Sequence, residues 1–317
     1  ENAPGVVIQC HMDMVCTSNK SDDCKVPFDF DNDPIEAYID GGWLKAKNTT
    51  LGADDGIGVA AGLALMEHPN LVHGAIELLI TADEETSMMG AIKLAKAPFL
   101  KNKILINVDS EEDHRICIGC AGGFNKHFTV NMNRVALKKT ASASKVYEMN
   151  ISGLCGGHTG IQIHLGRANA IQCIARILNY LVIDQKIEVQ LVDIRGGNAM
   201  NAIPNASQCT VVVAAGDAEK YEQAVTEYWL NYVLPEFKDI ENKMHMDSRP
   251  IRDFDFNAVK VCDAASTQRL VALMMMLPHG VVRMSPTVPG LVQTSIAFSM
   301  LSMEKNENVA KCQCFAR

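Results

Sequence analysis

The chain has 317 residues, of which 48% are hydrophobic, and its formal net charge is −8. This length and apolar content allow a large buried core and suggest two domains. The basic residues are scattered, so no nucleic-acid partner and no acidic membrane surface is indicated. No apolar run reaches the length of a membrane span, so no membrane partner is expected either.

The cysteine content indicates a reducing compartment. The chain contains 11 cysteines, an odd number, and they are spread over segments that read as core. Such thiols usually serve as small apolar residues. Cys117 and Cys120 have the spacing of a zinc-ligand pair, but the second pair that a structural zinc site needs is absent. We therefore expect free thiols and a cytoplasmic protein.

The first part of the chain alternates strands with helices. Val6–Cys10 is a short apolar run, typical of a strand that is buried on both faces. A hairpin around Asp40-Gly-Gly42 follows. The next elements are a helix to about Glu67, a strand at 75–80, a helix near 86–97 and a strand at 103–108. This order predicts an α/β domain with a mainly parallel sheet and helices on both faces.

Residues that can bind metal ions follow the predicted strands or begin the next helix. They are His11, Asp13, Asp54, Glu84, Glu85 and Asp109. Sites in parallel sheets form beyond the carboxyl ends of the strands, so we expect these side chains to converge. Imidazole and carboxylate groups suit zinc or a similar divalent ion. Taken singly, each acid could instead cap the free N–H groups at a helix start.

The pattern also suggests how the ligands divide between two ions. Asp54 lies in a tight turn and could bridge two ions that clamp a water and polarise a carbonyl group. His11 would bind one ion, Asp13 would orient its imidazole, and Asp109 would complete that ion's ligands. One member of Glu84-Glu85 could bind the second ion while the other acts as general base.

The pattern changes after about residue 124, and strands mix with longer helices. Helices are predicted near 166–182, 217–233 and 264–277, with a charged loop over 236–255. Strands are predicted at 125–133, 145–152, 187–194, 207–214, 292–301 and 309–316. We therefore expect two domains, an α/β domain at 1–124 and an α+β domain at 125–317.

Seven motifs connect this sequence with a known family. They are Gln9-Cys-His-Met-Asp-Met-Val15, Thr50-Leu-Gly-Ala-Asp-Asp-Gly-Ile-Gly58, Asp83-Glu-Glu85, Asn107-Val-Asp-Ser-Glu-Glu112, Gly119-Cys-Ala-Gly-Gly123, Gly156-Gly-His-Thr-Gly160 and Asn201-Ala-Ile-Pro204. In these motifs the chain resembles the zinc-dependent aminoacyl-histidine dipeptidases (PepD-type, carnosinase-like), within the aminoacylase and glutamate-carboxypeptidase clan.

The resemblance implies roles for the metal-binding residues. His11 and Asp109 would bind one ion, Glu85 would bind the other, and Asp54 would bridge the two. Glu84 would be the general base, and Asp13 would support His11. The family's bridging aspartate precedes a non-proline cis peptide, which predicts a cis bond between Asp54 and Asp55.

The resemblance also implies a lid domain that contacts the substrate. His158 would polarise the substrate carbonyl, Asn201 would lie near the substrate, and Arg317 would hold its carboxylate. From the residues alone, His158 among its glycines could be a turn residue, and Arg317 could be a surface residue.

The implied activity is a metallo-dipeptidase, a hydrolase that uses two divalent ions to activate a water against small peptides such as Xaa-His and carnosine. Zinc is expected, with manganese or cobalt as alternatives. The lid domain could also mediate a homodimer. Rival readings are a tripeptidase, an N-acyl amino acid deacylase, or an inactive pseudo-enzyme. The pseudo-enzyme is a candidate because the family's final histidine ligand is absent from this sequence. We therefore expect a fragment whose catalytic domain is incomplete at its N-terminus and lacks its C-terminal part.

Overall fold

The computed structural model describes residues 3–18, 28–94, 99–110, 114–137 and 143–317. The chain divides into two compact units, Glu1–Ile118 and Gly119–Arg317. None of the described helices combines the length and the apolar character that crossing a membrane requires.

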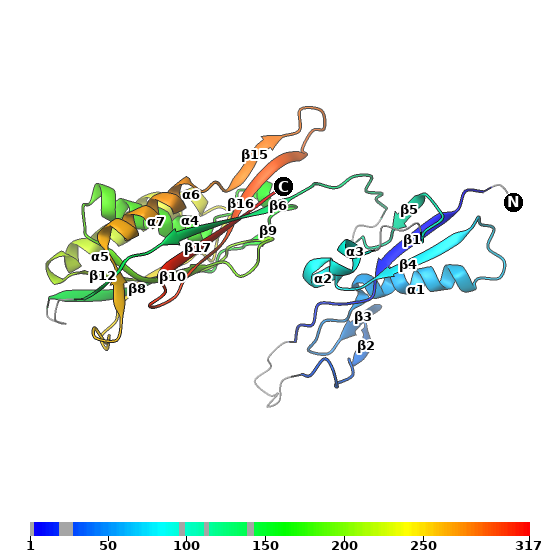
Figure 1. Cartoon of the computed structure of the whole chain (residues 1–317), viewed down its shortest axis with the longest axis horizontal. Coiled ribbons are helices and arrows are strands. Elements are labelled where there is room, and N and C mark those ends of the chain that lie inside the picture. Colours follow the sequence, from blue (N-terminus) through cyan, green and yellow to red (C-terminus); the bar gives the residue numbers. More distant parts are fainter. Residues whose placement is uncertain (1–2, 19–27, 95–98, 111–113, 138–142) are drawn as a thin grey trace. The chain divides into compact units, whose positions relative to one another are not determined.

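The first unit is built on a parallel sheet. Its strand order is β4-β1-β5, with β4 at Ile76–Thr81, β1 at Val6–His11 and β5 at Ile104–Asn107. Both neighbours run parallel to β1 (Figure 1). The predicted parallel arrangement is therefore confirmed for these strands, and their carboxyl ends share one edge of the sheet.

Helix α1, at Ala53–Glu67, packs against β1 and β4. Its approach depends on Gly62, because a Cβ atom there would lie 2.4 Å from Leu78 Cδ1. The predicted hairpin is present as β2, Ala37–Asp40, and β3, Trp43–Ala46. Coverage of both faces of the sheet by helices stays a prediction.

The helix predicted near 86–97 is wrong over its described residues. Two short helices take its place, α2 at Glu84–Ser87 and α3 at Met89–Ile92. Met88 separates them in the left-handed region, with φ of 54°. A residue in that region cannot continue an α-helix, so the chain turns between the two segments. Residues 95–97 of the predicted helix lie outside the described part.

The second unit contains an eight-stranded sheet in which neighbouring strands run antiparallel. The order is β13-β8-β12-β10-β16-β17-β6, and β15 pairs with β16. The strands are β6 Phe124–Asn131, β8 Ser144–Ser152, β10 Gln190–Gly196, β12 Ser207–Ala214, β13 His245–Pro250, β15 Gly280–Met284, β16 Val292–Met303 and β17 Val309–Ala316.

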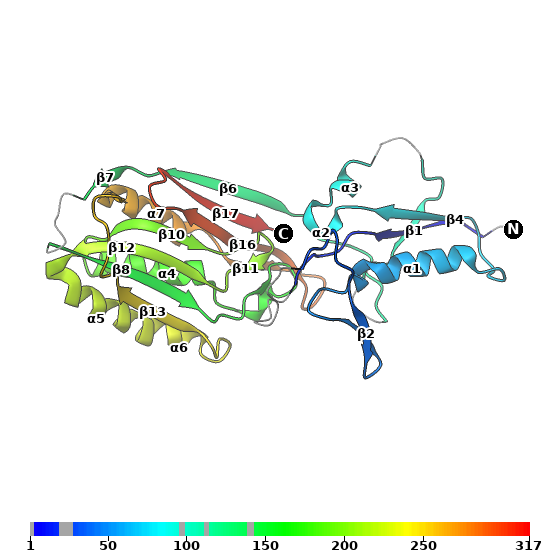
Figure 2. The same cartoon turned by 90° about the horizontal axis from the view of Figure 1, so that it is seen from below.

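Helices pack around the main core of the unit, which lies against this sheet. They are α4 Ala170–Asn179, α5 Ala218–Tyr228, α6 Leu234–Phe237 and α7 Ala264–Met276. Helix α4 contacts β8, β10, β12 and β16, while α5 contacts β12 and α7 contacts β10 (Figure 2). Alternate residues of β8 (Tyr147, Met149 and Ile151) point into this core. The α+β architecture predicted for this part of the chain is thus observed.

The opposite face of the sheet carries a smaller core. It consists of Val146, Val192, Val212 and Val261, the last from β14, Lys260–Cys262, which pairs with β7, Arg134–Ala136. Two further short strands, β9 at Gly157–His158 and β11 at Ala202–Ile203, pair with each other.

One correction concerns the predicted charged loop over 236–255, because β13 lies within it. The strand is polar, and it sits at the edge of the sheet beside β8. Backbone hydrogen bonds to β8 stabilise it, so it carries little of the apolar signal that predicts a strand.

The thiols behave largely as expected. Six cysteines are buried without a disulfide, which confirms their use as small apolar residues: Cys10, Cys173, Cys209, Cys262, Cys312 and Cys314.

Candidate metal centre

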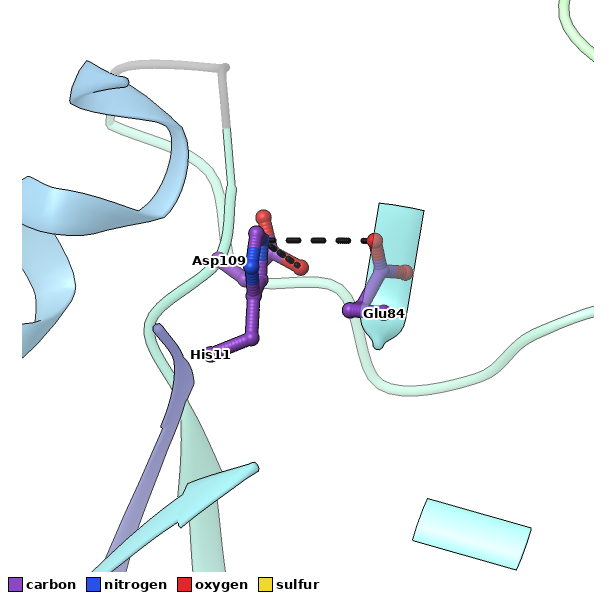
Figure 3. Close-up of side chains that lie close together, drawn as sticks. All are labelled: His11, Glu84 and Asp109. Atoms are coloured by element: carbon purple, nitrogen blue, oxygen red, sulfur yellow. Dashed lines mark ion pairs between the residues drawn. The ribbon is translucent and has the colours of Figure 1, made fainter. Parts of the chain in front are cut away.

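His11 is the centre of a cluster of acidic side chains in the first unit. It is the last residue of β1, and only 1% of it is exposed. Its Nε2 atom lies 3.0 Å from Asp54 Oδ1, 3.7 Å from Asp109 Oδ2 and 4.0 Å from Glu84 Oε2. Figure 3 shows the imidazole of His11 facing the carboxylates of Glu84 and Asp109.

The fold itself brings these residues together. His11 ends the central strand, Glu84 and Glu85 follow β4, and Asp109 follows β5. Two sets of ligand atoms each lie within 4.8 Å of one another, His11 with Glu84 and Asp109, and His11 with Asp54 and Glu85. All the residues predicted to bind metal, together with the predicted base, thus gather at the carboxyl edge of the parallel sheet.

The orientation of the His11 ring suits a metal ligand. The backbone carbonyl of Asp13 lies 3.0 Å from Nδ1, so Nδ1 carries the proton and donates it to this carbonyl. Nε2 faces the carboxylate cluster and lies 3.0 Å from Asp54 Oδ1, to which it donates when it is protonated. Loss of the Nε2 proton would leave the tautomer that a ligating imidazole requires.

The side chain of Asp13 organises the neighbouring turn. Its Oδ1 accepts a hydrogen bond of 3.0 Å from the Glu84 N–H, and its Oδ2 accepts one of 3.1 Å from the Glu85 N–H. Burial raises the pKa of Asp13, but these two hydrogen bonds outweigh burial and lower its pKa below the ordinary value. A charged Asp13 therefore links the end of β1 to the two glutamates.

Asp55 supports the candidate site, and the sequence patterns assign it no role of its own. It is buried, and its Oδ2 accepts the His11 N–H at 3.2 Å while its Oδ1 accepts the Gly58 N–H at 3.2 Å. The peptide bond between Asp54 and Asp55 is cis, as the family resemblance predicts. Gly58 is needed here, because a Cβ atom would lie 2.3 Å from Asp55 Oδ1. The adjacency of two aspartates was the only available signal.

The charges of this cluster fit a divalent cation. Burial, followed by the charges of Asp54 and Asp55, raises the pKa of Asp109 to about 6. Burial and the charges of Asp54 and Glu84 also raise the pKa of Glu85. Crowded carboxylates of this kind resist ionisation until a cation compensates them. The donor set of one imidazole and several carboxylates matches zinc, manganese or cobalt.

The residues predicted to contact substrate gather in the second unit. His158 lies on β9, and its Nε2 atom is 3.4 Å from Arg317 Nη2. The Asn201 carbonyl accepts the N–H of Thr159, and the next residue, Ala202, pairs with His158. The guanidinium of Arg317 lies 4.7 Å from the centre of the Phe315 ring. The three residues are therefore neighbours within this unit.

The fold and the site together place the chain in a class of protein. Its members have two units and a candidate divalent-cation centre at the carboxyl edge of a parallel sheet. Comparison with known proteins makes the class more specific. Residues 150–230 match the family described as "Peptidase dimerisation domain".

Two relatives match nearly the whole chain. The cytosol non-specific dipeptidase of Escherichia coli (strain K12) is 35% identical over 312 residues, which are 98% of this chain and 61% of that protein. The crystal structure of aminoacylhistidine dipeptidase from Vibrio alginolyticus aligns with a TM-score of 0.74 and 38% identity, covering 100% of this chain and 61% of that one.

These matches confirm the resemblance to dipeptidases of the aminoacylhistidine type. The chain spans about three fifths of the length of both relatives.

Proposed function

We propose that this chain carries the metal centre and the substrate-contacting unit of a metal-dependent dipeptidase that hydrolyses small peptides, including Xaa-His dipeptides such as carnosine. The observation that carries the proposal is the buried His11 imidazole facing the carboxylates of Asp54, Glu84 and Asp109. The two relatives are both named as dipeptidases, which supports the same activity.

Two divalent ions are proposed, with zinc as the preferred metal. His11 and Asp109 would hold one ion, Glu85 would hold the other, and Asp54 would bridge them. Bound ions would supply Lewis-acid chemistry, polarising the peptide carbonyl and making water more acidic.

Glu84 is proposed as the general base. Its carboxylate is about one third exposed and lies 4.0 Å from His11 Nε2, so it borders the cluster and remains open to solvent. The hydrogen bond from its own N–H to Asp13 holds its backbone in place. From there Glu84 can accept a proton from the attacking water and pass it to the leaving amine.

Three residues of the second unit are proposed to contact the substrate. The His158 imidazole would donate to the substrate carbonyl oxygen, which gains negative charge during attack. Arg317 would pair with the substrate carboxylate, a task that suits the planar fork of a guanidinium. Asn201 would line the same subsite.

The match of residues 150–230 to a peptidase dimerisation domain supports a homodimer formed through the second unit. We also propose a cytoplasmic location. The buried thiols support it, as does the name of the Escherichia coli relative, a cytosol dipeptidase.

The decisive experiment combines metal analysis with turnover. The purified protein should hold about two divalent ions per chain and should hydrolyse carnosine faster than an N-acetylated amino acid. Faster turnover of the acetylated substrate would favour a deacylase. Less than about one ion per chain, with no hydrolysis, would favour the pseudo-enzyme.

A single variant tests the base. Glu84→Gln should remove hydrolysis and keep metal binding, since Gln retains the size of Glu84 but cannot accept the proton. Glu67→Gln, at the exposed end of α1, is the matched control and should behave as the wild type. Normal turnover in Glu84→Gln would show that the base is another residue.

A further inference from the structure

Two side chains hold the loop that carries His158, and neither has a role in the proposed reaction. Gln162 Oε1 accepts the His158 backbone N–H at 2.9 Å. Arg167 Nη1 donates to the Gly156 carbonyl at 2.6 Å and to Gln162 Oε1 at 3.3 Å. The amide of Gln162 thus connects the guanidinium of Arg167 to the backbone of His158.

These two side chains, the Gln162–Arg167 brace, fit closely against the loop. Gly157 has φ of +133°, a conformation that side chains rarely adopt. A Cβ atom there would lie 2.4 Å from Arg167 Nη1 and 2.6 Å from Gln162 Oε1. The backbone at Gly157 therefore lies directly against both side chains, and the loop has little freedom to shift.

The loop in turn selects the tautomer of His158. Its Nδ1 atom accepts the backbone N–H of Gly160 at 3.2 Å and that of Ile161 at 3.1 Å. An atom that accepts from two amides carries no proton of its own, so a neutral ring must carry its proton on Nε2. Burial, and then the charge of Arg317, lower the pKa of His158, which favours this neutral form.

In this tautomer, the Nε2–H of His158 lies beside the guanidinium of Arg317. Nη2 of Arg317 lies 3.4 Å from Nε2 and would donate to it in the opposite tautomer. In the Nε2–H tautomer, which the two amides on Nδ1 favour, both atoms are donors and neither satisfies the other. Among the described residues, the buried Arg317 Nε also has no hydrogen-bond partner. Converging donors without an acceptor provide a site for an electron-rich oxygen.

We propose that Gln162 and Arg167 are positioning residues that brace the 156–161 loop, so that its amides hold His158 as the Nε2–H tautomer, a neutral donor to a substrate oxygen. The identity of that oxygen rests on the proposed function. The tautomer and the brace rest only on the contacts within the second unit.

The tautomer can be measured without turnover. In protein with ¹⁵N-labelled histidine, long-range ¹H–¹⁵N correlation spectra distinguish a protonated ring nitrogen from an unprotonated one. His158→Gln identifies the His158 signals among those of the nine histidines. Near pH 7.5 we expect an unprotonated Nδ1 and a protonated Nε2. A protonated Nδ1 in the wild-type protein would overturn the proposal.

The brace is tested by two substitutions at one position. Gln162→Leu removes the acceptor, and the His158 signals should move toward the average of both tautomers. Gln162→Glu keeps an acceptor for both donors and should retain the wild-type pattern. Gln268→Leu, at an exposed position of α7, controls for a general effect of the substitution. Wild-type signals in folded Gln162→Leu would overturn the brace.

Kinetics separate this inference from the proposed function. If the wild type hydrolyses dipeptides, kcat should fall roughly 10-fold or more in Gln162→Leu, with a smaller change in KM and recovery in Gln162→Glu. An unchanged kcat in Gln162→Leu would count against the brace. A wild type that shows the expected tautomer but no hydrolysis would refute the proposed function and leave the brace to be judged by the spectra.

Discussion

Replacing Asp13 with Asn should weaken metal binding, although Asp13 is not itself proposed as a ligand. Both carboxylate oxygens accept backbone N–H groups, Oδ1 from Glu84 and Oδ2 from Glu85. Asn offers one oxygen and one NH₂ group, so one of the two N–H groups loses its acceptor and faces another donor. Leaving one such group unsatisfied costs about 1–3 kcal/mol.

This cost falls on the turn that presents both glutamates. We therefore expect Zn²⁺ affinity to fall by about 10- to 100-fold, the usual loss when a residue supporting the ligands is changed. Isothermal titration of the apo-protein with Zn²⁺ measures the affinity, and urea unfolding reports any change in stability.

The neighbouring aspartate provides the control. Asp83 is exposed, adopts the left-handed conformation that Asn tolerates well, and caps no helix N–H with its side chain. Asp83→Asn should leave the affinity unchanged. Equal affinities of wild type and Asp13→Asn would refute the view that Asp13 organises the metal centre.

Two further predictions concern stability of the second unit. Burial lowers the pKa of His279 from 6.5 to about 4, and its Nδ1 lies 3.1 Å from Asn169 Nδ2. The unfolded chain therefore binds a proton that the folded chain excludes, so this contribution to stability is full above pH 6.5 and is lost as pH falls toward 4. The free energy of unfolding, measured in urea, should fall by about 1 kcal/mol between pH 7.5 and pH 5.5 because of this residue. His279→Gln should weaken this pH dependence. An identical pH dependence in the variant would contradict the assignment. At Gly197, φ is +70° and a Cβ atom would lie 1.9 Å from the Ser299 carbonyl oxygen, so Gly197→Ala should destabilise the unit by roughly 2–5 kcal/mol, whereas Gly216→Ala, which meets nothing within 4 Å, should not. Equal thermal midpoints for these two variants would show that the backbone at Gly197 can relax.

Much of the candidate metal centre could be anticipated from local patterns. Apolar runs followed by His11, Glu84-Glu85 or Asp109 indicate parallel strands that end in ligand-type residues. Such strands are aligned by their backbone pairing, so residues just beyond their carboxyl ends must become neighbours. The position of each ligand-type residue directly after an apolar run therefore predicts a site whose residues lie far apart in the chain.

The supporting contacts could not be anticipated in this way. Asp55 bonds to His11 across 44 residues, and Asp13 bonds to Glu84 across 71. The Gln162–Arg167 brace is local, yet its residues have no pattern that sets them apart from ordinary loop residues. The polar edge strand β13 reads as a loop from the sequence for a similar reason.

The difference has one physical origin. Hydrophobic periodicity records which face of an element is buried, and it is written in neighbouring residues. A hydrogen bond that orients a functional group depends on where two segments meet after packing, and an Asp or Gln has the same identity whether or not it finds that partner. The chain order therefore indicates the elements and the candidate ligands, while packing sets the contacts of the His11 and His158 rings and of the acids beside the candidate ligands.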